Sequence, residues 1–248
     1  MKRSISAVLA AWFLSISAAA APAPERPARI LFIGNSLTYV HDVPGIVAAF
    51  AAAAGMPPPV CRSVVGGGFS LEDHWDKGAA QKTLEEEKWD FVVLQQGPSA
   101  SPEGRDLLIR YARRFEPLIR RAGAKPALYM VWPSVSRRRD FGGVSDSYRL
   151  AARDVGGALL PAGEAWLIAE KVRPGLRLYS EDGLHPTAAG SYLAAAVIYA
   201  GLTGKSPLGL PAGVATASGE SIQLEEADAK ALQEASARAV KEHGMRPR

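Results

Sequence analysis

Cysteine is nearly absent from this sequence of 248 residues, which contains only Cys61. One thiol cannot form an intramolecular disulfide, so the fold must be stabilised by its hydrophobic core, which is feasible at this length. The sequence also has no large excess of positive over negative charge. The formal net charge is +4, and the only tight basic cluster, residues 137–139, stands beside Asp140. The sequence therefore predicts no nucleic-acid partner.

The long apolar run that suggests targeting lies at the N-terminus. Lys2 and Arg3 precede residues 7–21, which are apolar apart from Ser15 and Ser17. A basic start, a short apolar stretch and a small-residue end are typical of a secretory signal peptide, and the run is short for a membrane span. We predict a signal peptide over 1–21, a spacer over 22–27, a periplasmic or secreted location and no stable membrane insertion after cleavage. An uncleaved anchor is the alternative.

Short apolar runs alternate with longer helical patterns through the rest of the chain. This alternation predicts an α/β fold with a mostly parallel sheet covered by helices on both faces. No second domain is apparent, so we assign 28–207 to one domain and 208–248 to a connector and a C-terminal helix that packs on it. The expected strands are 28–34, 60–65, 91–94, 127–132 and 158–161, and the expected helices are 42–55, 71–87, 103–122, 146–155, 187–202 and 222–242.

The first predicted strand ends in Gly34-Asn35-Ser36. Ser36 would then stand at the carboxyl edge of the sheet, where parallel α/β sheets bind their ligands. These residue types are also common in plain strand-to-helix turns, so this motif alone leaves that reading open.

An acid and a histidine follow much later, at Asp182 and His185. A serine hydroxyl needs a base to accept its proton, and an imidazole oriented by a carboxylate provides one. Three residues of turn-forming chain allow one loop to present both groups. Asp-Gly also marks ordinary turns, which is the structural alternative.

Two further polar clusters follow the second and third predicted strands. Residues 66–70 read Gly-Gly-Gly-Phe-Ser and lack the motifs of nucleotide-binding loops, so they favour a loop whose backbone N–H groups approach a substrate oxyanion. Gln95 and Gln96 follow the third strand, and a glutamine side chain can donate a hydrogen bond to developing negative charge. A wet surface loop is the alternative for the glutamines.

Taken in order, these clusters make residues 30–207 resemble the GDSL-like, or SGNH, hydrolase family. Gly34-Asn35-Ser36-Leu37 is similar to the family's first block, with Asn35 in place of the usual Asp. Gly68 falls in the second block and Asp182 to His185 match the Asp-x-x-His block. The resemblance implies a three-layer α/β/α, flavodoxin-like sheet of about five strands. It also implies Ser36, Asp182 and His185 as catalytic residues.

The third block departs from the family, because Gly-x-Asn-Asp is absent. Residues 95–99, Gln-Gln-Gly-Pro-Ser, are more similar to the His-Gln-Gly-Glu-Ser stretch of the carbohydrate acetylesterase branch. That similarity implies an oxyanion hole formed by the Ser36 and Gly68 amides and the Gln96 side chain, with Gln95 as the fallback donor. No cofactor and no metal are implied.

The expected function is that of an exported serine esterase, acting on a small-molecule or carbohydrate ester and releasing short acyl groups, acetyl above all. A lipase or thioesterase of longer acyl chains is the second option, and a non-catalytic envelope carbohydrate-binding domain the third. Phe69, Trp75 and Trp132 lie near predicted strand ends, where they either stack on a sugar or pack in the interior. The sequence gives no indication of the oligomeric state.

Overall fold

The computed structural model describes residues 26–247, so the predicted signal peptide and most of the predicted spacer lie outside the described residues. In this range, no helix has both the length and the apolar character required to cross a membrane. The elements in chain order are β1 (Arg29–Gly34), α1 (Ser36–Tyr39), η1 (Val40–Asp42), α2 (Val43–Ala53), β2 (Val60–Val65), α3 (Leu71–Lys77), α4 (Ala79–Glu86), β3 (Phe91–Leu94), α5 (Pro102–Arg121), β4 (Lys125–Met130), η2 (Val135–Asp140), α6 (Phe141–Asp154), β5 (Ala158–Pro161), α7 (Ala162–Val172), α8 (Ala188–Thr203), β6 (Gly213–Ala215), β7 (Ser221–Gln223) and α9 (Glu226–His243).

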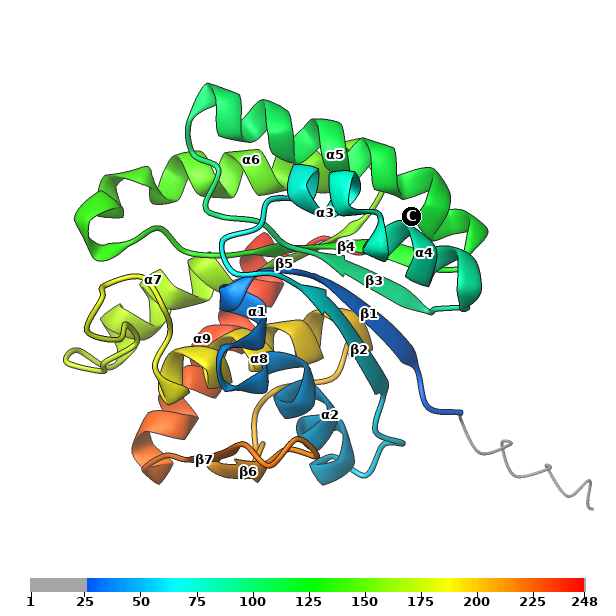
Figure 1. Ribbon diagram of the computed structural model, residues 1–248. Helices are drawn as coiled ribbons and strands as arrows, with labels where there is room; N and C mark the ends of the chain where they lie inside the picture. The colour runs from blue at the N-terminus through cyan, green and yellow to red at the C-terminus, as the bar shows by residue number, and fades with distance from the viewer. Residues whose placement is uncertain (1–25, 248) are drawn as a thin grey trace, which may run out of the picture.

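Strands β1 to β5 form one parallel sheet in the order β2-β1-β3-β4-β5. Helices α3 to α6 cover one face of this sheet, and α2, α8 and α9 lie on the other face (Figure 1). The predicted three-layer α/β/α fold with a five-stranded, flavodoxin-like sheet is confirmed.

Strand β1 lies between β2 and β3, so the strand order reverses at this position. The connection from β1 to β2 runs through α2 on one face, and the connection from β2 to β3 runs through α3 and α4 on the other. The loops at the carboxyl ends of the strands diverge at such a reversal and leave a crevice, which is where doubly wound sheets bind ligands. Ser36 is the first residue after this end of β1 to enter a helix.

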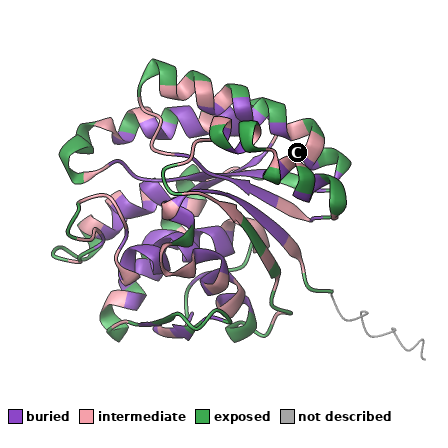
Figure 2. Ribbon diagram, viewed as in Figure 1, coloured by how far each residue is buried: buried purple, intermediate pink, exposed green. Residues whose placement is uncertain are grey.

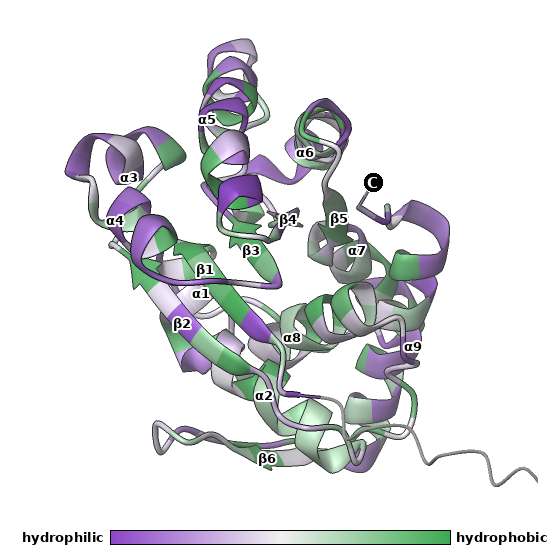
Figure 3. Cartoon of the chain, turned by 90° about the vertical axis from the view of Figure 1, so that its right-hand side faces the viewer, coloured by the Kyte–Doolittle hydropathy of each residue, from purple (hydrophilic) through white to green (hydrophobic). Residues whose placement is uncertain are grey.

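The core is formed by the central strands and by the helices packed on both faces (Figure 2). The four residues from Ile30 to Ile33 are buried, as expected for a parallel strand with helices on both sides. Helix α8 is buried at every position from Ala189 to Ala200, because α2, α7, α9 and β5 all contact it. In Figure 3, α8 is white to green along its length, whereas α5 alternates between hydrophilic and hydrophobic residues.

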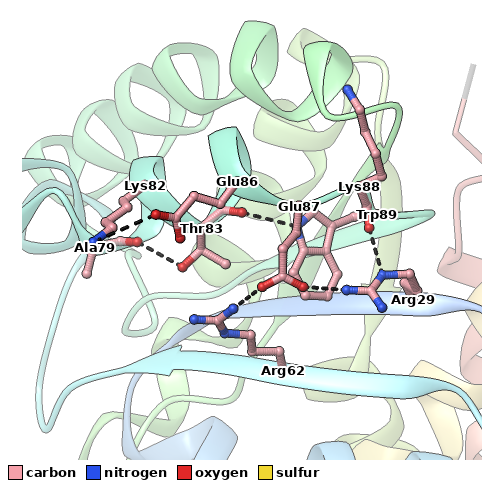
Figure 4. Close-up of polar contacts among 9 residues, drawn as sticks. All are labelled: Arg29, Arg62, Ala79, Lys82, Thr83, Glu86, Glu87, Lys88 and Trp89. Atoms are coloured by element: carbon pink, nitrogen blue, oxygen red, sulfur yellow. Dashed lines mark hydrogen bonds and ion pairs between the residues drawn. The ribbon is translucent and has the colours of Figure 1, made fainter.

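Strand β2 is an edge strand, and its exposed residues are Val60 at its start and the polar Arg62 and Ser63 in its middle. Glu87 follows α4 and forms ion pairs with Arg29 on β1 and Arg62 on β2 (Figure 4). Arg29 also donates through Nε to the carbonyl oxygen of Lys88 at 2.9 Å. These side chains are partly exposed, so each ion pair contributes little to stability. The charges on the edge strand disfavour pairing with another chain.

Several stretches differ from the sequence-based expectation. The helix expected over 146–155 begins earlier, at Phe141, and the strand expected over 127–132 is Lys125–Met130. The helix expected over 71–87 is two helices, because Gly78 ends α3 in a left-handed conformation with a φ of 77°. Helix α7 was not predicted, since it follows β5 directly, with no turn residues to separate them. Residues 213–215 and 221–223 form an antiparallel pair inside the expected connector, so the last helix begins at Glu226 rather than at 222.

Candidate active site

The turn after β1 presents Ser36 at the carboxyl edge of the sheet. Asn35 is the N-cap of α1, and its Oδ1 accepts a hydrogen bond from Leu37 N at 3.1 Å. The same Oδ1 accepts from Gln95 Nε2 at 2.9 Å, and Asn35 Nδ2 donates to Phe69 O at 3.0 Å. Asn35, which stands where the family has Asp, therefore ties the serine turn to the loops that follow β2 and β3.

The structure brings Ser36, His185 and Asp182 into one hydrogen-bonded chain, although Ser36 and His185 are 149 residues apart in sequence. His185 Nε2 lies 2.8 Å from Ser36 Oγ, and His185 Nδ1 is hydrogen-bonded to Asp182 Oδ2. An ionised carboxylate can only accept, so Nδ1 carries the proton and Nε2 accepts from the serine hydroxyl. This is the arrangement by which an imidazole removes a proton from a serine.

The loop between α7 and α8 is shaped around Asp182. Asp182 Oδ1 accepts from Leu184 N and His185 N, each at 2.9 Å, and from Ser180 Oγ at 2.8 Å. Hydrogen bonds from the His185 ring, Leu184 N and Ser180 hold the pKa of Asp182 well below its usual range. The carboxylate is therefore ionised at neutral pH. The buried Trp132 also holds this loop, because its Nε1 donates to Leu184 O at 3.0 Å.

The glycine loop, residues 66–70, is fixed against the serine turn. Gly66 N donates to Gly34 O at 3.2 Å, and a side chain at Gly66 would collide with the Phe69 ring, since its Cβ would lie 2.5 Å away. Gly68 has a φ of 71°, a conformation that favours glycine. In the part of the chain that the structure describes, neither Ser36 N nor Gly68 N has a hydrogen-bond acceptor. Both N–H groups are therefore free to donate to a substrate oxygen.

His74 also contributes to this arrangement and was not singled out in the sequence. Its side chain is buried on α3, and its Nε2 lies 2.8 Å from Gly34 O, to which it donates. Burial lowers the pKa of His74, which favours the neutral ring. His74 thereby connects the helix after the glycine loop to the residue two positions before Ser36. Its partner is a backbone carbonyl, for which the sequence carries no signal.

The sequence predicted Gln96, or else Gln95, as an oxyanion donor, but neither side-chain amide is placed to donate to a substrate. Gln96 Oε1 accepts from Leu71 N at 3.1 Å, which turns Nε2 toward Ser99 Oγ at 2.7 Å and the carbonyl of Gly104 at 3.3 Å. Gln95 is fully buried, and its Nε2 donates to Asn35 and to Gln96 O. Both N–H atoms of each side-chain amide thus already have acceptors. The expected third oxyanion donor is corrected: the glutamines brace the loops and present no free N–H group.

A cavity of about 310 Å³ opens beside Gly68. It lies between the loops after β2, β3 and β4, and Ser36, Asp182 and His185 are not among its lining residues. Phe69 connects it to the Ser36 turn, because Phe69 O accepts from Asn35 Nδ2. Its walls are formed by glycine, alanine, serine and proline residues together with Gln96, Phe69 and Arg137. Such a mixture of small apolar surfaces and a few hydrogen-bonding groups is typical of a site for a small molecule.

Of the three aromatic residues considered as sugar platforms, only Phe69 lines this cavity. Trp132 is fully buried and stacks on Trp166, with ring centroids 3.6 Å apart, so it is a core residue. Trp75 packs edge-on against Phe115. The packing interpretation therefore holds for both tryptophans.

The Cys61 thiol is not suited to nucleophilic catalysis. Burial is the main cause that raises the pKa of Cys61 to about 12, so its thiol stays protonated and is a poor nucleophile. No group of three or more His, Cys, Asp or Glu side chains within 26–247 is arranged to hold a metal ion.

We expect Gly68→Ala to lower kcat on a nitrophenyl ester by roughly tenfold to a hundredfold. The added Cβ meets no atom within 4 Å, so the effect comes from forcing an L-residue into a φ of 71°, which turns the N–H away. Gly78→Ala is the matched control, because Gly78 has a φ of 77° and equally open surroundings but lies away from Ser36. Equal kcat losses in the two variants would contradict a role for the Gly68 amide.

Comparison with known proteins gives matches in structure alone. No protein-family model matches the chain, and no curated protein sequence matches it. Among solved structures, a protein from Slackia heliotrinireducens assigned to the SGNH hydrolases is 27% identical and has a TM-score of 0.59, with 71% of this chain and 99% of that chain covered.

Two further structures are similar at lower identity. A DUF4886 family protein from Bacteroides uniformis is 20% identical, with a TM-score of 0.70 over 88% of this chain and 96% of that one. An acetylxylan esterase from Geobacillus stearothermophilus, in the form of a catalytic mutant, is 15% identical, with a TM-score of 0.54 over 71% and 94% of the two chains. At these identities the likeness concerns the fold.

The fold and the serine at its switch point define the class as that of the α/β/α serine hydrolases. Within that class, the chain is similar in structure to the SGNH and GDSL-like hydrolases, which act on esters. The predicted resemblance and the predicted enzyme class are both confirmed.

Proposed function

We propose that this protein is an exported esterase that removes short acyl groups, acetyl above all, from carbohydrate, with Ser36 as nucleophile, His185 as base and Asp182 as the acid that orients His185. One observation carries the proposal: His185 Nε2 lies 2.8 Å from Ser36 Oγ while its Nδ1 is held by Asp182. Export rests on the basic and apolar N-terminal residues of the sequence.

The reaction proceeds through an acyl-enzyme. Ser36 Oγ attacks the ester carbonyl while His185 Nε2 takes its proton, and the carbonyl oxygen becomes an anion that accepts from Ser36 N and Gly68 N. The C–O bond to the alcohol then breaks, and His185 protonates the leaving oxygen. Water, deprotonated by His185, attacks the acyl-enzyme, and Ser36 recovers its proton as the acid leaves. Asp182 stays ionised throughout and stabilises the protonated imidazole.

Two observations favour an acetylated carbohydrate as substrate. The cavity beside Gly68 is lined by small residues and Phe69 and also by Ser70, Gln96, Ser99, Ser101 and Arg137, which offer hydrogen-bonding groups to a sugar. Two structures of the similar acetylxylan esterase are of catalytic mutants, one without an aspartate and one without a histidine three residues further on. Asp182 and His185 have the same spacing.

The acyl preference is tested with p-nitrophenyl acetate and p-nitrophenyl octanoate. We expect kcat/KM to be roughly tenfold or more higher for acetate, because the alcohol part of the ester is taken to fill the cavity beside Gly68, which leaves the seven alkyl carbons of octanoate in water. A steep preference for octanoate would contradict deacetylation and favour the lipase or thioesterase alternative. A fluorophosphonate probe tests the enzyme class itself, since a non-catalytic binding domain would not be labelled at Ser36.

A further inference from the structure

Arg137 is the only charged side chain that lines the cavity beside Gly68. Its element, η2, is anchored next to the His185 loop, because Val135 N donates to Gly183 O at 2.8 Å. The Val135 side chain also lies against Gly183. The position of Arg137 is therefore coupled to the loop that carries His185.

The guanidinium of Arg137 is oriented by one hydrogen bond, which leaves part of its donor capacity for a ligand. Arg137 Nε donates to Asp140 Oδ2 at 2.6 Å, while the two terminal nitrogens have no acceptor among residues 26–247. The neighbouring arginines differ: Arg138 is paired through both terminal nitrogens with Glu170, and the Arg139 side chain is 93% exposed and lines no part of the cavity. Two free, coplanar N–H-bearing nitrogens are suited to a carboxylate.

The size of the cavity indicates which part of a substrate reaches Arg137. An acetyl methyl group is close in size to a water molecule, which takes about 30 Å³ in the liquid. The cavity of about 310 Å³ is far larger than an acetyl group requires. Within the proposed function, this leaves the alcohol part of the ester to fill the cavity, where the hydroxyl groups of a sugar ring would meet the serine and Gln96 side chains and its C–H faces the Phe69 ring.

We propose that Arg137 is a specificity-determining residue that binds the carboxylate of an acidic sugar, so that the preferred substrate is an O-acetylated uronic acid unit. This inference rests on the proposed esterase function. The Arg137 side chain is 63% exposed and forms an ion pair with Asp140. Its attraction for a substrate carboxylate is therefore weakened by water and salt. The expected preference is therefore modest, about threefold to tenfold in kcat/KM at low ionic strength.

The experiment compares O-acetylated glucuronic acid with O-acetylated glucose, measuring released acetate, with p-nitrophenyl acetate as a third substrate. The wild-type protein is expected to prefer the acid, mainly through a lower KM, and to lose the preference as salt is added. Arg137→Gln should abolish the preference, measured as the ratio of kcat/KM for the acidic sugar to kcat/KM for the neutral sugar. Arg139→Gln is the matched control, since it removes an arginine that also faces Asp140, and it should behave as wild type.

A preference that survives in Arg137→Gln would overturn the assignment, as would equal rates of the wild-type protein on the two sugars. Hydrolysis of p-nitrophenyl acetate without hydrolysis of either sugar would also overturn it, while leaving the esterase in place. Failure to hydrolyse any of the three esters would instead refute the proposed function itself, and this inference with it.

Discussion

Ser36→Ala is expected to lower kcat on p-nitrophenyl acetate by roughly four to six orders of magnitude, the scale found when the nucleophile of a serine triad is removed. The reason is geometric, because Ser36 Oγ is the hydroxyl within hydrogen-bonding distance of His185 Nε2. The oxyanion donors are backbone N–H groups and survive the substitution, so some rate above that in water should remain.

The fold should tolerate the loss of the Ser36 hydroxyl, since among residues 26–247 this hydroxyl is hydrogen-bonded to His185 alone. The change in the free energy of unfolding should stay within about 0.5 kcal/mol. Labelling by a fluorophosphonate should disappear. Ser136→Ala is the control, because Ser136 is an exposed serine whose hydroxyl is hydrogen-bonded to Ser134, and it should keep both activity and labelling. Wild-type turnover by the Ser36 variant would refute the nucleophile assignment.

The fold was predictable because its signals are local. The buried run Ile30–Ile33 and the amphipathic pattern of α5 each identify an element within a few residues. A parallel sheet then follows from the alternation of strands and helices, and its carboxyl edge gathers the loops that carry Ser36, Gly68 and His185. The predicted signal peptide concerns residues outside 26–247 and stays a prediction.

What sequence reasoning missed depends on which partner a side chain selects in three dimensions. A free Gln96 side-chain amide would be a suitable oxyanion donor, but its Oε1 accepts from Leu71 N and its Nε2 donates to Ser99 Oγ. His74 shows the opposite case, a buried ring whose acceptor, Gly34 O, is 40 residues away and belongs to the backbone. Neither pairing leaves a spacing that can be read along the chain.

Substitutions at Asp182 and His185 should separate orientation from proton transfer. His185→Ala removes the base and is expected to lower kcat about as much as Ser36→Ala, since the residues of a triad act as a unit. Asp182→Asn should cost less, roughly a hundredfold to ten-thousandfold, because the base remains but the amide N–H opposes the tautomer in which Nδ1 donates. The measurement is kcat at neutral pH, where the wild-type carboxylate is ionised because its pKa is held below the usual range.

Asp182→Ala should be more damaging than Asp182→Asn, because Asp182 has two tasks. Oδ2 orients the His185 ring, while Oδ1 holds the loop through Leu184 N, His185 N and Ser180. Asparagine keeps an acceptor that can serve the loop, whereas alanine removes both contacts and frees the backbone that carries His185. Equal activity of the two variants would show that the loop contacts at Oδ1 contribute nothing to the placement of His185. Wild-type activity in both would remove Asp182 from the mechanism and leave His185 to act without a carboxylate.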